Sequence, residues 1–142
     1  RFGWDRIAFA EIRDLNRHRT GNKYCPLVPI GFYCALDQLP ATEESKMQLL
    51  RQQANVGKKL MIKARNLLRN GVAHYPYWTQ LGTEYFFEHI TTGDKFLYEA
   101  ELRTGLGAHF RYAKHLRDVL ALWYQHFPST KGIILEGSAE PE

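Results

Sequence analysis

The sequence predicts an α+β fold in which helices predominate. Three stretches, residues 4–20, 42–71 and 108–127, repeat apolar side chains at three- and four-residue steps, the spacing of one helix face. Only residues 83–90 carry the alternation that is typical of a half-buried strand. The chain has 142 residues, of which 44% are apolar, enough for one core. We therefore expect a single domain over residues 1–135, followed by a disordered acidic tail over residues 136–142.

The first two elements differ in their proline content. Residues 4–20 place apolar side chains at helical spacing, and Gly21 is a suitable helix stop. The members of this stripe are Trp4, Ile7, Ala8, Ile12 and Leu15. Residues 22–41 contain three prolines, which exclude a regular helix and predict an extended, packed loop.

A long helix is predicted next, from Thr42 to a stop at Gly71. Thr42 offers an N-cap hydroxyl, and Glu43 and Glu44 follow in the first turn. Gly57 lies within the apolar stripe, which indicates close packing or a bend. The stripe consists of Met47, Leu50, Ala54, Met61, Ala64 and Leu68. The basic face is interpreted as solvated, with nucleic-acid binding as the minor alternative; it carries Arg51, Lys58, Lys59, Lys63, Arg65 and Arg69.

The remaining elements follow from breakers and caps. Residues 72–91 favour extended structure, and Thr92 and Asp94 then begin a short helix that ends near Arg103. A glycine-containing turn over residues 104–107 leads into the last helix, residues 108–127, which Pro128 ends.

Charge and composition exclude several classes of protein. The formal net charge is +4, and leaving out the three glutamates of the tail raises it to about +7, which favours an anionic partner. The two cysteines and six histidines fit no metal or redox spacing, and no apolar run is long enough for a membrane span. We expect no metal and no membrane, and a reducing, cytoplasmic location. The chain begins at Arg1 rather than Met, which is typical of a processed product or a piece of a longer protein.

Two motifs carry cations beside turns. Arg17-His18-Arg19 closes the first predicted helix, and Glu101-Leu102-Arg103-Thr104-Gly105-Leu106-Gly107-Ala108-His109 surrounds the glycine turn. Forked guanidinium donors suit phosphate oxygens, so these motifs predict a site for a nucleotide or flavin phosphate. Each motif also has a structural alternative. The first motif could be a solvated helix end where His18 caps carbonyls. In the second motif, Arg103 could pair with Glu99, and His109 could be only a neighbour of a core stripe.

These motifs resemble the flavin-dependent thymidylate synthases. Arg17-His18-Arg19 precedes a proline-rich loop that ends in Gly31-Phe32-Tyr33, as in the family's signature region. The order of the downstream elements is also similar: a long helix, a strand, a short helix ending in Leu102-Arg103, a turn with His109 and a final helix. The resemblance implies a flavin-dependent thymidylate synthase-like domain, and one that is N-terminally truncated relative to the family.

The resemblance also implies ligands and roles. Arg17, His18 and Arg19 would contact FAD and the pyrimidine nucleotide, with His109 as a further cofactor-binding residue. Arg103 matches the arginine that binds dUMP and polarises it for methyl transfer, so it is the expected catalytic residue. Methylenetetrahydrofolate and NADPH would be the co-substrates. The family forms homotetramers, which implies a homo-oligomer here or a partner half within a longer chain.

This chain departs from the family at its nucleotide-binding positions. Ile30-Gly31-Phe32 stands where the family has Ser-x-Arg, and a second arginine position falls near Phe86. Each lost charge-assisted bond costs roughly 1.5–3 kcal/mol of binding free energy. We therefore expect no catalysis by this chain alone. Two other functions remain open: a non-catalytic structural or oligomerisation domain, with arginines paired to Asp14 or Glu101, and a basic nucleic-acid-binding module.

Overall fold

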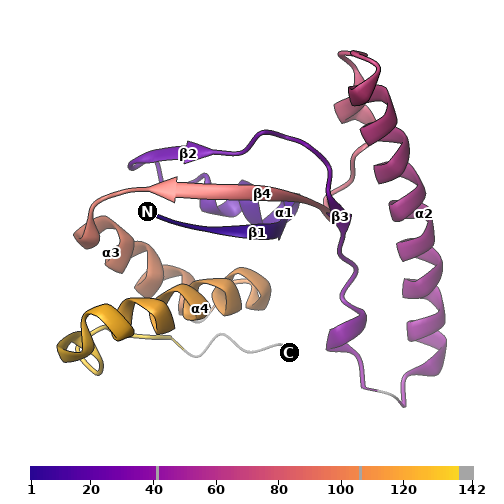
Figure 1. Cartoon of the computed structure of the whole chain (residues 1–142). Coiled ribbons are helices and arrows are strands. Elements are labelled where there is room, and N and C mark those ends of the chain that lie inside the picture. Colours follow the sequence, from indigo (N-terminus) through magenta and orange to yellow (C-terminus); the bar gives the residue numbers. More distant parts are fainter. Residues whose placement is uncertain (41, 106, 138–142) are drawn as a thin grey trace. The chain divides into compact units, whose positions relative to one another are not determined.

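The computed structural model describes residues 1–40, 42–105 and 107–137, and Figure 1 shows its elements. The chain divides into two compact units. The helix-pair unit comprises Arg1–Phe2, His18–Asn22 and Ile90–Glu142; the sheet unit comprises Gly3–Arg17 and Lys23–His89. The single domain over residues 1–135 stays a prediction. Of the tail over residues 136–142, residues 138–142 lie outside the described part.

A small sheet is built around β4 (Thr83–Ile90). The strand order is β1 (Phe2–Ala8), β4 and β2 (Asn22–Tyr24), and β3 (Gly31–Phe32) pairs antiparallel with β4. Gly31 lies opposite Glu84 and Phe32 opposite Thr83. The alternation predicted for β4 is confirmed, because Tyr85, Phe87 and His89 are buried while the residues between them are only half-buried.

The predicted helix over residues 4–20 is wrong in its first half. Phe2–Ala8 form β1, and α1 spans only Phe9–Leu15. β1 lies so close to β4 that a Cβ on Gly3 would sit 2.5 Å from the Phe87 carbonyl oxygen, and Trp4 stacks on Phe87 at 6.2 Å. Pairing with a strand about eighty residues away overrides the local helical spacing. Ile7, Ala8, Ile12 and Leu15 are nevertheless buried, as the stripe predicted.

The long helix is confirmed as α2 (Glu44–Arg69), with Gly71 at φ 70° just beyond its end. Thr42 is not its cap: Glu43 occupies that position, and its side chain makes no capping hydrogen bond. The predicted stripe faces inward at Ala54, Gly57, Met61 and Ala64. The extended loop before α2 is confirmed, with one 3₁₀ turn at Leu36–Gln38, whereas the stretch after it contains an unpredicted 3₁₀ turn at Tyr75–Trp78.

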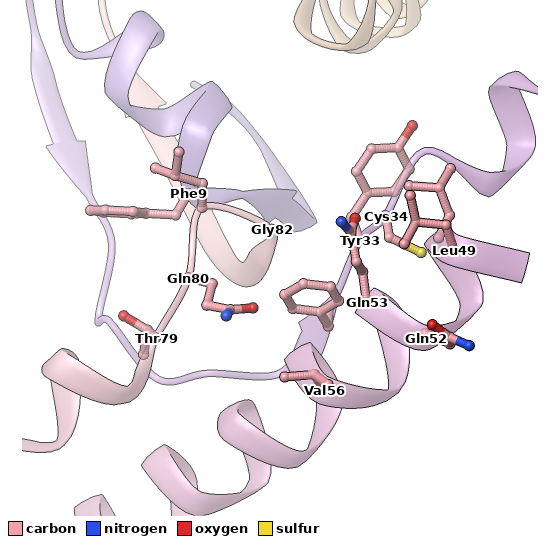
Figure 2. Close-up of a pocket in the computed structure, with 13 residues that line it drawn as sticks. Phe9, Tyr33, Cys34, Leu49, Gln52, Gln53, Val56, Thr79, Gln80 and Gly82 are labelled. Atoms are coloured by element: carbon pink, nitrogen blue, oxygen red, sulfur yellow. The ribbon is translucent and has the colours of Figure 1, made fainter. Parts of the chain in front are cut away.

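Close packing at Gly57, one of the two predicted possibilities, is confirmed. A Cβ on Gly57 would lie 2.1 Å from Cζ of the Phe32 ring, so the ring occupies the space of the missing side chain. The surface of the sheet unit is hollowed beside this contact, where α2 meets β3 and the loop before β4 (Figure 2).

The helix-pair unit is built from α3 (Gly93–Thr104) and α4 (Phe110–His126), both as predicted, with Thr92 at the N-cap of α3 and Pro128 beyond α4. The core between the helices contains Phe96 against Trp123 at 5.3 Å, and Phe2 against Phe96 at 5.0 Å. The C-terminal segment returns to α3, where the Leu135 amide donates to Glu101. Among the described residues, no helix is long and apolar enough to cross a membrane.

Candidate anion site around His18 and Arg103

The two sequence motifs reach the site from the ends of helices. α1 ends at Leu15 with Asn16 as its C-cap, so Arg17, His18 and Arg19 follow the helix rather than form its last turn. Arg103 lies in the last turn of α3, one residue before its end. His18 and Arg103 both belong to the helix-pair unit, whereas Arg17 belongs to the sheet unit.

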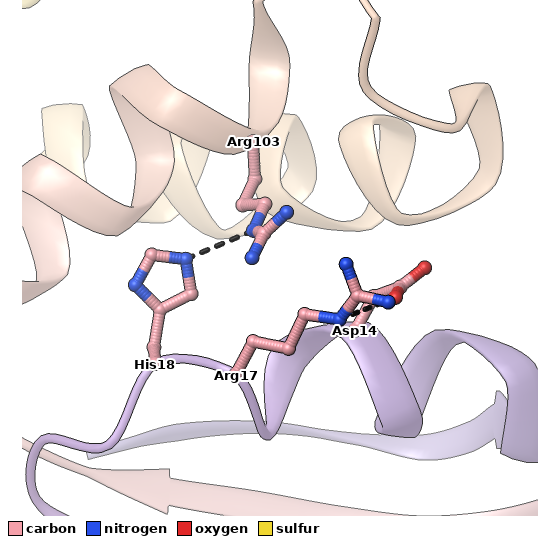
Figure 3. Close-up of polar contacts among 4 residues, drawn as sticks. All are labelled: Asp14, Arg17, His18 and Arg103. Atoms are coloured by element: carbon pink, nitrogen blue, oxygen red, sulfur yellow. Dashed lines mark hydrogen bonds and ion pairs between the residues drawn. The ribbon is translucent and has the colours of Figure 1, made fainter.

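A hydrogen bond joins the motifs. Arg103 Nε donates to His18 Nε2 over 2.9 Å, although the residues are 85 positions apart (Figure 3). An arginine can only donate, so Nε2 must carry a lone pair and the imidazole must be neutral, with its proton on Nδ1. The His18 side chain is only 8% exposed. The contact fixes the plane of the guanidinium, because Nε is one of its five coplanar donors.

Aromatic rings surround this pair. Arg103 Cζ lies 5.8 Å from the centroid of the Tyr112 ring, within the range of a cation–π interaction. The exposed Tyr98 ring meets His18 edge-on at 6.1 Å. Tyr112 is buried and also lies 6.1 Å from the His109 ring, so it connects the two predicted residues of the second motif. We call His18, Tyr98, Arg103 and Tyr112 the arginine–aromatic cluster.

His109 has a structural contact of its own. It is the N-cap of α4, where its Nδ1 accepts a hydrogen bond from the Arg111 amide at 3.3 Å, and its exposed ring stacks on Phe110 at 4.5 Å. This geometry favours the structural interpretation that the sequence left open for His109. Its assignment as a cofactor-binding residue stays a prediction. Leu106, in the turn before it, lies outside the described residues.

Arg17 and Arg19 differ from Arg103. Arg17 Nε lies 3.3 Å from the Asp14 carboxylate one helical turn earlier, and the arginine side chain is 64% exposed. The hypothesis of a structural domain predicted this ion pair. An exposed pair contributes about 0.2–1 kcal/mol to the free energy of unfolding. Arg19 is exposed and makes no hydrogen bond or ion pair with any described residue. Cofactor binding by Arg17 and Arg19 stays a prediction.

The chemistry of the cluster is that of recognition. Its one cation is oriented by a neutral histidine and lies beside aromatic rings, which suits a planar anion or a phosphate attached to an aromatic group. In the described part of the chain, no group of three His, Cys, Asp or Glu side chains could hold a metal ion. Sequence reasoning found His18 and Arg103 through their motifs. It missed Tyr112, whose only signal was its position three residues after His109.

Comparisons with known proteins bear on the fold. No family model and no curated protein matches the chain, but 85 chains of solved structures do. One is the crystal structure of a UMP/dUMP methylase, PolB from Streptomyces cacaoi, bound with 5-Br dUMP. The TM-score is 0.61 at 12% identity, and the match covers 84% of this chain and 63% of that one. The chain therefore spans less than two thirds of the matched chain. At this identity the likeness establishes the fold, which is α+β and mostly helical as predicted.

Proposed function

We propose that the chain is a thymidylate synthase-like domain that binds a pyrimidine nucleotide or a flavin phosphate at the arginine–aromatic cluster. The hydrogen bond between Arg103 and His18 carries the proposal, because it joins the two motifs on which the family resemblance rests. The fold shared with a methylase whose structure contains 5-Br dUMP supports the same class of ligand.

The role of each residue follows from the geometry. His18 holds the guanidinium plane, and Arg103 supplies the charge that meets a phosphate or polarises the pyrimidine carbonyl. Tyr98, which is 61% exposed, offers a ring face for stacking. When bound, reduced FAD would mediate methyl transfer between methylenetetrahydrofolate and dUMP, with NADPH as the source of electrons.

Methyl transfer by this chain alone lies outside the proposal. Phe32 and Phe86 stand where the family has nucleotide-binding arginines, and neither ring can bond to phosphate. With two such bonds lost, the affinity falls on the order of a hundred-fold or more. A partner half or another copy of the chain would have to supply the missing contacts. We therefore expect that this chain does not restore growth of a thymidine-requiring cell without thymidine.

Direct binding measurements test the proposal. Equilibrium dialysis against dUMP, and visible absorption after incubation with FAD and gel filtration, should show a retained ligand. Arg103→Gln should weaken retention about tenfold or more, the loss of one charge-assisted bond. Arg69→Gln removes the same charge from the exposed end of α2 and should leave retention unchanged. Thermal melting of each variant checks that it folds.

A second candidate is a non-catalytic structural or oligomerisation domain. The Arg17–Asp14 ion pair and the N-cap contact of His109 favour it, because both turn predicted ligand-binding groups toward the protein itself. Failure to retain either dUMP or FAD, together with a stable oligomer in sedimentation, would support this candidate and refute the first.

A further inference from the structure

A second concave site lies in the sheet unit, outside the arginine–aromatic cluster. One of its residues, Phe32, stands where the family has a nucleotide-binding arginine. The cavity has a volume of about 830 Å³ and is bounded by α2, β3, the start of α1 and the loop before β4 (Figure 2). Pockets for small molecules are typically 300–1,000 Å³ in volume. The space is therefore large enough for a compact organic molecule.

Three aromatic rings line the cavity, and each is held by a contact of its own. Phe9 packs edge-on against Tyr85 at 5.8 Å. The Tyr33 hydroxyl donates to Asp37 at 3.0 Å. Phe32 is confined by two glycines, since a Cβ on Gly57 or Gly82 would come within 2.1 or 3.0 Å of its Cζ atom. Rings fixed in this way offer apolar surface without a further loss of conformational freedom on binding.

The polar side chains of the cavity are three glutamine amides, the hydroxyls of Tyr33 and Thr79, and the Cys34 thiol. Gln52, Gln53 and Gln80 line it, and none of their side chains hydrogen bonds to a described residue. Each amide can donate two hydrogen bonds and accept others. Figure 2 shows Gln80 and Gln53 on opposite sides, one from the loop before β4 and the other from α2. They are therefore placed to contact different edges of one bound molecule.

The uncharged lining favours a neutral ligand over an ion. Among the described residues that line the cavity there is no aspartate, glutamate, lysine, arginine or histidine. The side of an ion that faces the wall would lose hydration without gaining a charged partner, whereas a neutral molecule would not incur this cost. Apolar side chains also stand exposed around the space: Leu49 at 56%, Val56 at 53% and Leu81 at 53%.

We propose that this cavity binds an uncharged, planar heteroaromatic molecule, held against Phe9, Phe32 and Tyr33 and hydrogen bonded at its edges by glutamine amides. The ligand class differs from that of the arginine–aromatic cluster, which recognises an anion. No residue is shared between the two sites, so either proposal can fail without the other.

The test uses two fluorescent probes that differ in charge. 7-Amino-4-methylcoumarin is neutral and planar, and its 3-acetate derivative adds one carboxylate to the same ring. Titration of the full chain should show saturable binding of the neutral probe, with the acetate at least about tenfold weaker. Val56→Trp fills the cavity and should weaken binding of the neutral probe at least about tenfold. Ile62→Trp is the matched control, since it adds the same side chain to an exposed position of α2 away from the cavity lining.

Three outcomes would overturn the proposal. The neutral probe does not saturate up to its solubility limit, the two probes bind equally, or both tryptophan variants have the same effect. A fourth result also refutes it: if the chain is oligomeric and Val56→Trp, but not Ile62→Trp, dissociates the oligomer in sedimentation, a second copy fills the cavity. Circular dichroism of both variants establishes that they are folded.

Discussion

Replacing Gly57 by alanine should destabilise the protein, although alanine is the better helix former. On an unhindered helix the substitution stabilises by about 0.8–1 kcal/mol. Here the new Cβ would lie 2.1 Å from Cζ and 2.4 Å from both Cε atoms of Phe32. An ordinary contact begins at 3.4 Å, so the ring must retreat by about 1.3 Å or α2 must move away. Overpacking of this kind lowers the free energy of unfolding by about 1–3 kcal/mol. After the gain in helix propensity is subtracted, we expect a net loss of about 1 kcal/mol in the free energy of unfolding.

The effect of Gly57→Ala should depend on whether the Phe32 ring is present. Phe32→Ala removes the three atoms nearest to the new Cβ, so in that background Gly57→Ala should raise the free energy of unfolding by about 1 kcal/mol. Urea denaturation followed by circular dichroism gives the midpoint and slope for all four proteins of the cycle. Asn55→Ala, at an exposed position two residues earlier, controls for helix propensity. Equal stabilisation by Gly57→Ala in both backgrounds would refute the argument.

Two further predictions concern the helix-pair unit. Burial and a 2.6 Å hydrogen bond to the Glu136 carboxylate raise the pKa of the Tyr124 hydroxyl from 10.0 to about 12. The folded chain thus holds this proton more tightly than the unfolded chain, so the stabilisation is complete below pH 10 and is lost as the pH rises towards 12. Tyr124→Phe should remove that decline between pH 10 and 12, and an unchanged decline would show that another group causes it. We also predict that the chain is not a monomer, because Ile133 and Leu135 are 73% and 75% exposed; sedimentation equilibrium with only a 16.5 kDa species at micromolar concentration would contradict this.

The candidate site was only partly readable from the sequence. The motifs singled out His18 and Arg103, but their contact joins residues 85 positions apart and depends on how α3 packs within its unit. The cavity gave no signal as a site, although Phe32 and Tyr33 lie in the segment that resembles the family's signature region. Phe9, Gln53 and Gln80 belong to three separate segments with no shared motif. The pairing of β3 with β4 and the hydrogen bond from the Ala10 amide to the Leu81 carbonyl help to bring those segments together.

Local signals by themselves determined α2, β4, α3 and α4. In α2, β4 and α4 the apolar side chains recur at the period of the element, and α3 was found from the capping residues at its start. The tertiary structure decided the rest. Residues 4–8 have the spacing of a helix, yet they form part of β1 because Gly3 permits a close approach to β4 and Trp4 gains a partner in Phe87. The free energy of such a pairing belongs to two distant segments together, so neither segment reveals it alone.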